Sequence, residues 1–144
     1  MDDSADTAAG FPSSILDGAS EVLDAKLKEG EVDPDRRLFL EGVQKLEQGD
    51  LEEATKKFRR AARKSPPPFD ALARVSRGEC ERLRGNLGVA IRQWREVAEN
   101  DNAPSAARYM AWLSIAAAAD SRDDDRLLER ARRAIDDLES SEEV

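Results

Sequence analysis

Basic side chains, which can bind anions, are concentrated in the middle of the chain. Residues 56–95 carry twelve arginines and lysines against three acids, a net charge of +9. Residues 1–55 carry −10 and residues 96–144 carry −7, so the whole chain is at −8. Guanidinium and ammonium groups attract carboxylates and phosphates. We call these bases the basic belt: Lys56, Lys57, Arg59, Arg60, Arg63, Lys64, Arg74, Arg77, Arg82, Arg84, Arg92 and Arg95.

Few residues could support catalysis or hold a metal. The sequence has no histidine, which is the commonest general base and metal ligand. Cys80 lies in a predicted helix, so we expect a small buried side chain rather than a reactive thiolate. Asp123, Asp124 and Asp125 are consecutive and point different ways around a helix start, which they stabilise through its dipole. We therefore predict no enzyme activity, no cofactor and no metal.

The single cysteine excludes an intramolecular disulfide, and no apolar run reaches the ~20 residues that a membrane span requires. The first residues, MDDSADTAAG, are acidic and lack the basic-then-apolar order of a secretion signal. We therefore expect a soluble cytoplasmic protein with no membrane partner.

Helices must position the basic belt, because apolar residues recur at helical spacing and no strand-like alternation appears. Asp33 followed by Pro34 predicts the start of one helix, and Gly49 predicts its end. Asp50 predicts the cap of the next helix, which the sequence SPPP at 65–68 stops. The stretch at 34–66 is thus predicted to be a helical hairpin with a tight turn.

The same pattern returns 36 residues later. Gly42 and Gly49 are followed by Gly78 and Gly85, and Asn86 stands where Asp50 capped. The apolar stripe of the second helix also recurs: Leu51, Ala54, Phe58, Ala61 and Ala62 are followed by Leu87, Ala90, Trp94, Val97 and Ala98. Such self-similarity predicts repeated supersecondary units.

The repeat divides the chain into one domain at 13–138 between two tails. Its parts are a half-repeat helix at 13–30, hairpins at 34–66 and 69–103, and a degenerate third hairpin or cap at 104–138. Ser114 replaces the glycine of the third unit, and its turn, DSRDDD, reads one residue longer than the others. Residues 1–12 are predicted to be a disordered acidic tail and residues 139–144 an acidic tail. Seven helices are expected in all.

The spacing of Gly42, Gly49, Ala54, Phe58, Ala61 and Pro66 resembles a tetratricopeptide repeat, and Gly78, Gly85, Ala90 and Trp94 resemble a second one. The resemblance implies an all-α, right-handed superhelical stack of antiparallel helix pairs. Three features depart from the family: the period is 36 rather than about 34 residues, charged Glu41 and Arg77 precede the first glycines, and Lys45 and Glu81 stand at the tyrosine-like position three residues after them. Ion pairs between units, Glu41 with Arg77 or Lys45 with Glu81, would offset those charges.

Members of that family bind an extended peptide or a helix of another protein in a concave groove, lined by the first helix of each hairpin. The resemblance therefore implies a non-catalytic scaffold or adaptor. Carried onto this chain, the lining is Phe39, Val43, Leu46, Leu72, Val75, Glu79, Arg82, Leu83, Arg108, Ala111 and Ile115. Ordinary core packing is the alternative for Leu46, Leu72 and Val75.

The basic belt leaves several partners open. A positive middle between negative ends can attract an acidic peptide, the acidic N-terminal tail or a second copy of the chain, which would give a homo-oligomeric assembly. Nucleic acid is a further alternative for residues 56–95, although the acidity of the whole chain opposes it. A solvated charged surface without a partner is the simplest alternative.

Overall fold

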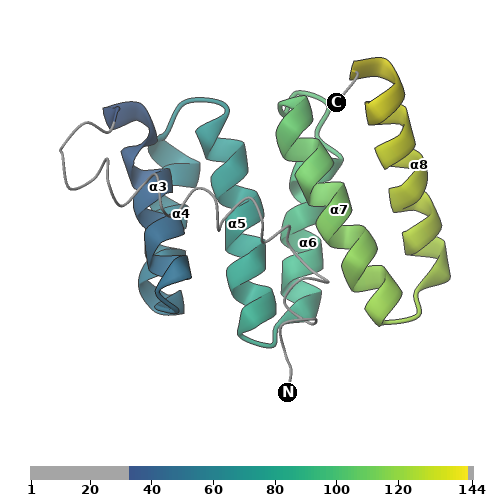
Figure 1. Cartoon of the computed structure of the whole chain (residues 1–144), viewed down its shortest axis with the longest axis horizontal. Coiled ribbons are helices and arrows are strands. Elements are labelled where there is room, and N and C mark those ends of the chain that lie inside the picture. The colour runs from purple at the N-terminus through teal and green to yellow at the C-terminus, as the bar shows by residue number, and fades with distance from the viewer. Residues whose placement is uncertain (1–32, 143–144) are drawn as a thin grey trace.

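The structure, a computed structural model, describes residues 33–142, and this part of the chain contains helices and no strand (Figure 1). The prediction of an all-α fold is confirmed. Residues 33–142 contain six helices, whereas seven were expected for the whole chain, and the predicted tail 1–12 and helix 13–30 lie outside the described residues. The helices are α3 (Pro34–Glu47), α4 (Leu51–Lys64), α5 (Phe69–Leu83), α6 (Leu87–Ala98), α7 (Ser105–Ser121) and α8 (Asp125–Glu142). Because α8 extends to Glu142, the acidic tail predicted from residue 139 begins inside a helix.

The predicted helix starts are confirmed at α3, α4 and α6, but the side-chain cap expected from Asn86 at α6 is not made. Asp33 accepts a hydrogen bond from the Asp35 amide at 2.8 Å, and Asp50 accepts one from the Glu53 amide at 3.2 Å. Asn86 precedes α6 without capping it, because its side-chain amide donates to Glu81 Oε1 at 2.9 Å instead.

One turn geometry closes α3, α5 and α7. Each turn has a residue with positive φ at the same place: Gly49 at 82°, Gly85 at 90° and Asp123 at 57°. In each turn the next amide bonds back to a carbonyl five residues earlier, at 2.8–2.9 Å, the pattern of a Schellman motif. The third turn is therefore no longer than the others, and the expected insertion lies in α7, which has 17 residues against 15 in α5.

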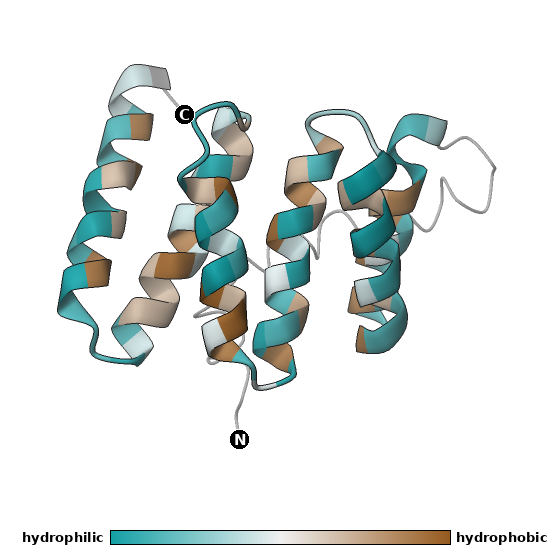
Figure 2. Cartoon of the chain, turned by 180° about the vertical axis from the view of Figure 1, so that it is seen from behind, coloured by the Kyte–Doolittle hydropathy of each residue, from teal (hydrophilic) through white to brown (hydrophobic). Residues whose placement is uncertain are grey.

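Consecutive helices pack against each other in chain order, and three-residue turns make the helices of each hairpin antiparallel (Figure 1). In addition α3 packs against α5 and α5 against α7, whereas α4 and α6 have no comparable contact. Figure 2, a ribbon coloured by hydropathy, shows that each helix carries both hydrophobic and hydrophilic residues along its length.

Two hydrophobic clusters form the core, and α5 contributes to both. Ala73 and Cys80 of α5 join the cluster built on Val43, Ala54 and Phe58. Ala71 and Val75, on another face of α5, join the larger cluster built on Trp94, Ala111 and Ile115 of α6 and α7. The two clusters are therefore connected through a single helix.

Gly42 and Gly78 permit the closest helix approaches in the first two hairpins. A Cβ atom added to Gly42 would lie 2.5 Å from Cε1 of Phe58, and one added to Gly78 would lie 2.6 Å from Cδ1 of Trp94. Both aromatic side chains are fully buried. Trp94 also donates its indole N–H to the Val75 carbonyl at 2.9 Å. In each hairpin, the aromatic ring therefore fills the space beside the glycine. The second pair lies 36 residues after the first.

The third hairpin is built differently. Ser114, which the 36-residue interval aligns with Gly78, donates its hydroxyl to the Met110 carbonyl at 3.1 Å. The large aromatic of this hairpin is Trp112 on its first helix, and Arg130 of α8 lies over that ring at 5.7 Å. The buried indole nitrogen of Trp112 has no hydrogen-bond partner. The third unit therefore lacks the small-residue and aromatic contact of the other two.

Candidate protein-interaction site

Most of the predicted groove lining is buried in the core. Val43, Leu46, Val75, Ala111 and Ile115 belong to the two hydrophobic clusters, and Glu79 is 3% exposed. Buried side chains cannot contact a partner at the surface, so the role predicted for these six residues is corrected to packing. The first helices are the inner members of this packing, and neighbouring helices cover the faces that the resemblance assigned to a partner.

Glu79 and Arg82 form a bidentate ion pair within α5. Arg82 Nε lies 2.9 Å from Glu79 Oε1, and Arg82 Nη2 lies 2.7 Å from Glu79 Oε2. Two parallel hydrogen bonds are the strongest arrangement for a guanidinium and a carboxylate. The pair therefore compensates the burial of the Glu79 charge.

The remaining groove residues are half-buried or exposed. Phe39 packs between Phe58 and Phe69, with ring centroids 5.9 and 6.0 Å away. Arg108 donates to the Ala98 carbonyl at 3.3 Å. Leu72 is half-buried against the larger cluster, and Leu83 is the one large apolar side chain among residues 33–142 that is clearly exposed, at 40%.

The basic belt divides into paired and unpaired bases. Four members form ion pairs with carboxylates: Lys56 with Glu53, Lys57 with Glu41, Arg82 with Glu79 and Arg95 with Glu99. Six members are exposed and form no ion pair with any residue of 33–142: Arg59, Arg60, Arg63, Lys64, Arg84 and Arg92. Among residues 33–142, neither ion pair expected between units is present: Glu41 pairs with Arg37 and Lys57 instead of Arg77, and Glu81 accepts from Asn86 rather than from Lys45.

Three arginines converge where α4 and α5 meet. Arg74 and Arg77 lie three residues apart on α5, and Arg74 reaches the Ala62 carbonyl of α4 at 3.3 Å. Burial lowers the pKa of Arg77, and the positive charges of Arg59 on α4 and of Arg74 lower it further. The carboxylates of Glu81 and Glu96 act in the opposite direction. We call the surface formed by Arg59, Arg74 and Arg77 the arginine channel.

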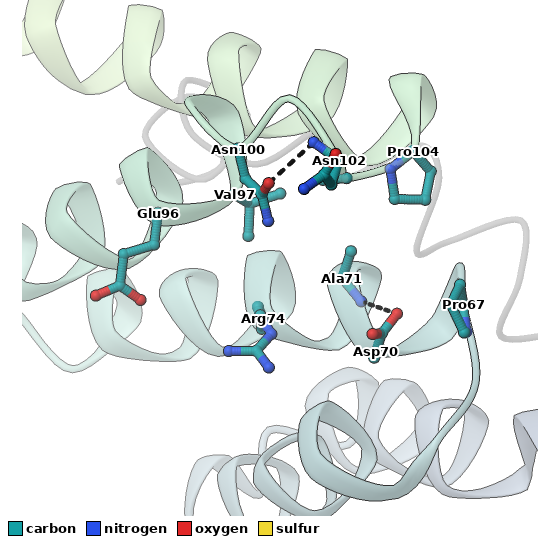
Figure 3. A pocket seen from close by; sticks show the side chains of 10 residues that line it. Pro67, Asp70, Ala71, Arg74, Glu96, Val97, Asn100, Asn102 and Pro104 are labelled. Atoms are coloured by element: carbon teal, nitrogen blue, oxygen red, sulfur yellow. Dashed lines mark hydrogen bonds between the residues drawn. The ribbon is translucent and has the colours of Figure 1, made fainter.

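A cavity of 380 Å³ lies beside Arg74, between the start of α5 and the end of α6 (Figure 3). Figure 3 shows Asp70 and Arg74 on α5, across from Glu96 near the end of α6 and from Asn100 just after that helix, with the Arg74 side chain extending away from α6. Asn100 accepts a hydrogen bond from the Asn102 amide at 2.9 Å, which holds the loop that leads to α7. The wall of the cavity thus mixes apolar with polar side chains, and its charged members are Asp70, Arg74 and Glu96.

Cys80 is buried and unreactive in this environment. Burial raises the pKa of its thiol to about 11, against an ordinary value of 9.0. A hydrogen bond with Thr55 and the neighbouring Arg84 act in the opposite direction and are outweighed. A thiol that keeps its proton at neutral pH is a poor nucleophile.

The aspartates at 123–125 are part of a turn and a helix start. Asp124 accepts a hydrogen bond from the Leu127 amide at 3.2 Å and so caps α8. Within residues 33–142, no three acidic or cysteine side chains come close enough together to hold a metal ion. None of the helices in this part of the chain has both the length and the apolar composition that crossing a bilayer requires.

Comparisons with protein-family models, with curated proteins and with solved structures found no match to this chain. Sequence reasoning identified the basic belt but not the channel within it. The spacing of Asp70, Arg74, Arg77 and Glu81 along one face of a helix was the signal that could have located it.

Proposed function

We propose that the chain is a non-catalytic protein-binding module, built as a tetratricopeptide-like stack of helical hairpins. The observation that supports it best is the repeated contact of Gly42 with Phe58 and of Gly78 with Trp94. Equivalent contacts 36 residues apart are expected when two successive hairpins are built in the same way, as the units of a repeat are. The interval, the identical turns at Gly49 and Gly85 and the chain-order packing all agree with this architecture.

The packing of alternate helices supports a curved stack. Contacts of α3 with α5 and of α5 with α7, without comparable contacts of α4 with α6, bring the first helices together and spread the second helices apart. Helical repeats that curve in this way present long surfaces to other proteins.

Self-assembly into a homo-oligomer is less well supported. The terminal helix α8 exposes charged side chains, among them Arg126, Glu129, Arg132 and Arg133. A polar outer face on the last helix is what a capped stack requires. This surface therefore opposes the addition of a further copy at the C-terminal end.

The test of a binding function is affinity capture with the full-length chain. The immobilised chain is mixed with a native lysate, and beads that carry an unrelated helical protein of equal net charge serve as the control. We expect at least one protein to be retained selectively, to be displaced by excess free chain and to bind again when purified. If every retained protein also binds the control beads, the proposed function is wrong.

A further inference from the structure

We propose that the arginine channel docks an acidic peptide segment of a partner protein, whose carboxylates contact Arg59, Arg74 and Arg77. This inference rests on the protein-binding function proposed above and assigns both the surface and the chemistry of the partner. It also moves the binding surface from the predicted concave groove, where most candidate residues are buried, to the side of α5 that lies between α4 and α6.

The shape of the channel follows from the packing of three helices. Helix α5 packs against both α4 and α6, and those two helices have no comparable contact with each other. The α5 face that carries Asp70, Arg74, Arg77 and Glu81 is therefore the floor between them. Arg59 of α4 and Glu96 of α6 both influence the pKa of Arg77, and both belong to helices that pack against α5. At one end the floor meets the 380 Å³ cavity (Figure 3).

The charges of the channel are not satisfied within the described chain. Arg59 is exposed and forms no ion pair with residues 33–142, and Arg74 contacts a carbonyl rather than a carboxylate. Three guanidinium groups close to one another repel, and an approaching carboxylate relieves that repulsion while gaining charge-assisted hydrogen bonds. The belt bases at Lys56, Lys57 and Arg95 are already paired, so the same argument does not extend to them.

The acids beside the three arginines favour a peptide over a nucleic acid. Asp70, Glu81 and Glu96 border the channel, and a phosphate backbone with a charge at every nucleotide would be repelled by them. A peptide can place acidic residues against the arginines and neutral residues against these carboxylates. Mixed charge of this kind selects partners by pattern as well as by net charge.

The test measures binding of a labelled acidic peptide of about twelve residues, a repeat of Glu-Ser-Ala, to the full-length chain by fluorescence anisotropy. Controls are the Gln-Ser-Ala peptide and a single-stranded oligonucleotide of equal charge. The channel variant carries Arg59→Gln, Arg74→Gln and Arg77→Gln. The matched variant carries Arg122→Gln, Arg126→Gln and Arg132→Gln, which are exposed arginines without ion pairs in the described chain. Circular dichroism melts verify that both variants fold.

We expect the wild-type chain to bind the acidic peptide, and the affinity to fall at least about tenfold in the channel variant and less than about twofold in the matched variant. A tenfold rise in ionic strength should also weaken the binding. A photo-reactive group on the peptide should cross-link to α4, α5 or α6, which is a readout that does not depend on the variants.

Any of four results would overturn the proposal: no binding of the acidic peptide, equal binding of the Gln-Ser-Ala peptide, equal losses in both variants, or tighter binding of the oligonucleotide. Lysate capture separates this proposal from the function on which it rests. If the channel variant retains the same verified partner as the wild type, the binding function stands and the channel does not carry it. If no partner is captured, the function itself fails.

Discussion

Glycine at positions 42 and 78 has a hydrogen atom where alanine would have a methyl group, and this difference lets the paired helices approach closely. The rings of Phe58 and Trp94 occupy the space that a Cβ atom would need. Gly88 lies in a helix as well, but a Cβ atom added there would meet nothing within 4 Å. All three glycines lower the stability of their helices, but only Gly42 and Gly78 allow a ring to pack closely against the backbone. Comparing the three therefore distinguishes these two effects.

Alanine substitutions at these glycines should have opposite effects. Gly42→Ala and Gly78→Ala are expected to destabilise the fold by roughly 1–3 kcal/mol, because the ring must move away from the new methyl group. Gly88→Ala is expected to stabilise it by up to about 1 kcal/mol through helix propensity alone. Urea unfolding of the three variants measures this, and a destabilised Gly88→Ala protein would show that the glycine has another role.

Cys80 should make the folded state less stable in alkaline solution. The folded thiol keeps its proton up to a pKa of about 11, whereas the unfolded thiol loses it near 9.0. The free energy of unfolding is therefore unaffected below pH 9 and falls as the pH rises from about 9 to about 11, by up to roughly 3 kcal/mol. Urea titrations of the wild type and of Cys80→Ala across this range measure the difference. An identical alkaline slope in both proteins would contradict the assignment.

At the scale of elements, the turns are more uniform than the helices they connect. Gly49, Gly85 and Asp123 adopt the same left-handed conformation, although only the first two are glycine. An L-residue with a side chain is strained in this region of φ, and aspartate tolerates it better than most. The third turn therefore keeps its shape at a cost that glycine would remove.

Asp123→Gly should stabilise the chain, and Gly85→Ala should destabilise it. We expect a gain of roughly 0.5–1 kcal/mol in the first variant and a loss of about 1 kcal/mol in the second, because only the backbone conformation differs. Thermal melts of the two variants and of the wild type measure these differences in stability. A melting temperature of Asp123→Gly below that of the wild type would mean that the aspartate side chain stabilises this turn.

The two buried tryptophans should respond differently to removal of the indole N–H. Trp94 donates that N–H to the Val75 carbonyl, whereas the Trp112 nitrogen is buried without a partner. Trp94→Phe should therefore cost about 1–2 kcal/mol more than Trp112→Phe, which removes an unsatisfied buried donor. Trp94→Ala, which also leaves a cavity, should cost on the order of 3–5 kcal/mol. Chemical unfolding compares the three, and equal losses in the two phenylalanine variants would be inconsistent with the hydrogen bond.

The elements could be predicted from the sequence because their signals are local. Proline at 34, glycine at 49 and 85, and the proline run at 66–68 act on the backbone directly, so the helix boundaries from α3 to α6 were predictable. The turn at Asp123 was misread because aspartate does not signal positive φ as glycine does. The groove was misjudged because burial depends on which helices meet, and periodicity does not reveal whether an apolar face meets a helix or a partner.

For the whole molecule, the shared helix α5 determines how the chain should unfold. Its faces complete both hydrophobic clusters, through Ala73 and Cys80 on one side and Ala71 and Val75 on the other. Helices α3 and α8 lie at the ends of the described chain and have fewer neighbours. The loss of α5 would therefore expose both clusters at once, whereas α8 can separate with less disruption.

Hydrogen exchange should reveal this order. Amides of α5 are expected to exchange slowest, at a rate set by global unfolding, and those of α8 fastest among the helices, because local opening costs least at an end of the packing. Mass spectrometry of peptides from each helix measures the rates in the full-length chain. Slower exchange in α8 than in α5 would show that the terminal hairpin, rather than the shared helix, holds the fold together.

The contacts of Gly42 with Phe58 and of Gly78 with Trp94 also constrain how this protein can evolve. In both hairpins the two positions are sixteen residues apart and fill one volume. A larger residue at the first position becomes tolerable once a smaller one stands at the second, so lineages should exchange them jointly. Natural variants of this gene are therefore expected to covary at 42 with 58 and at 78 with 94, while position 88 drifts alone.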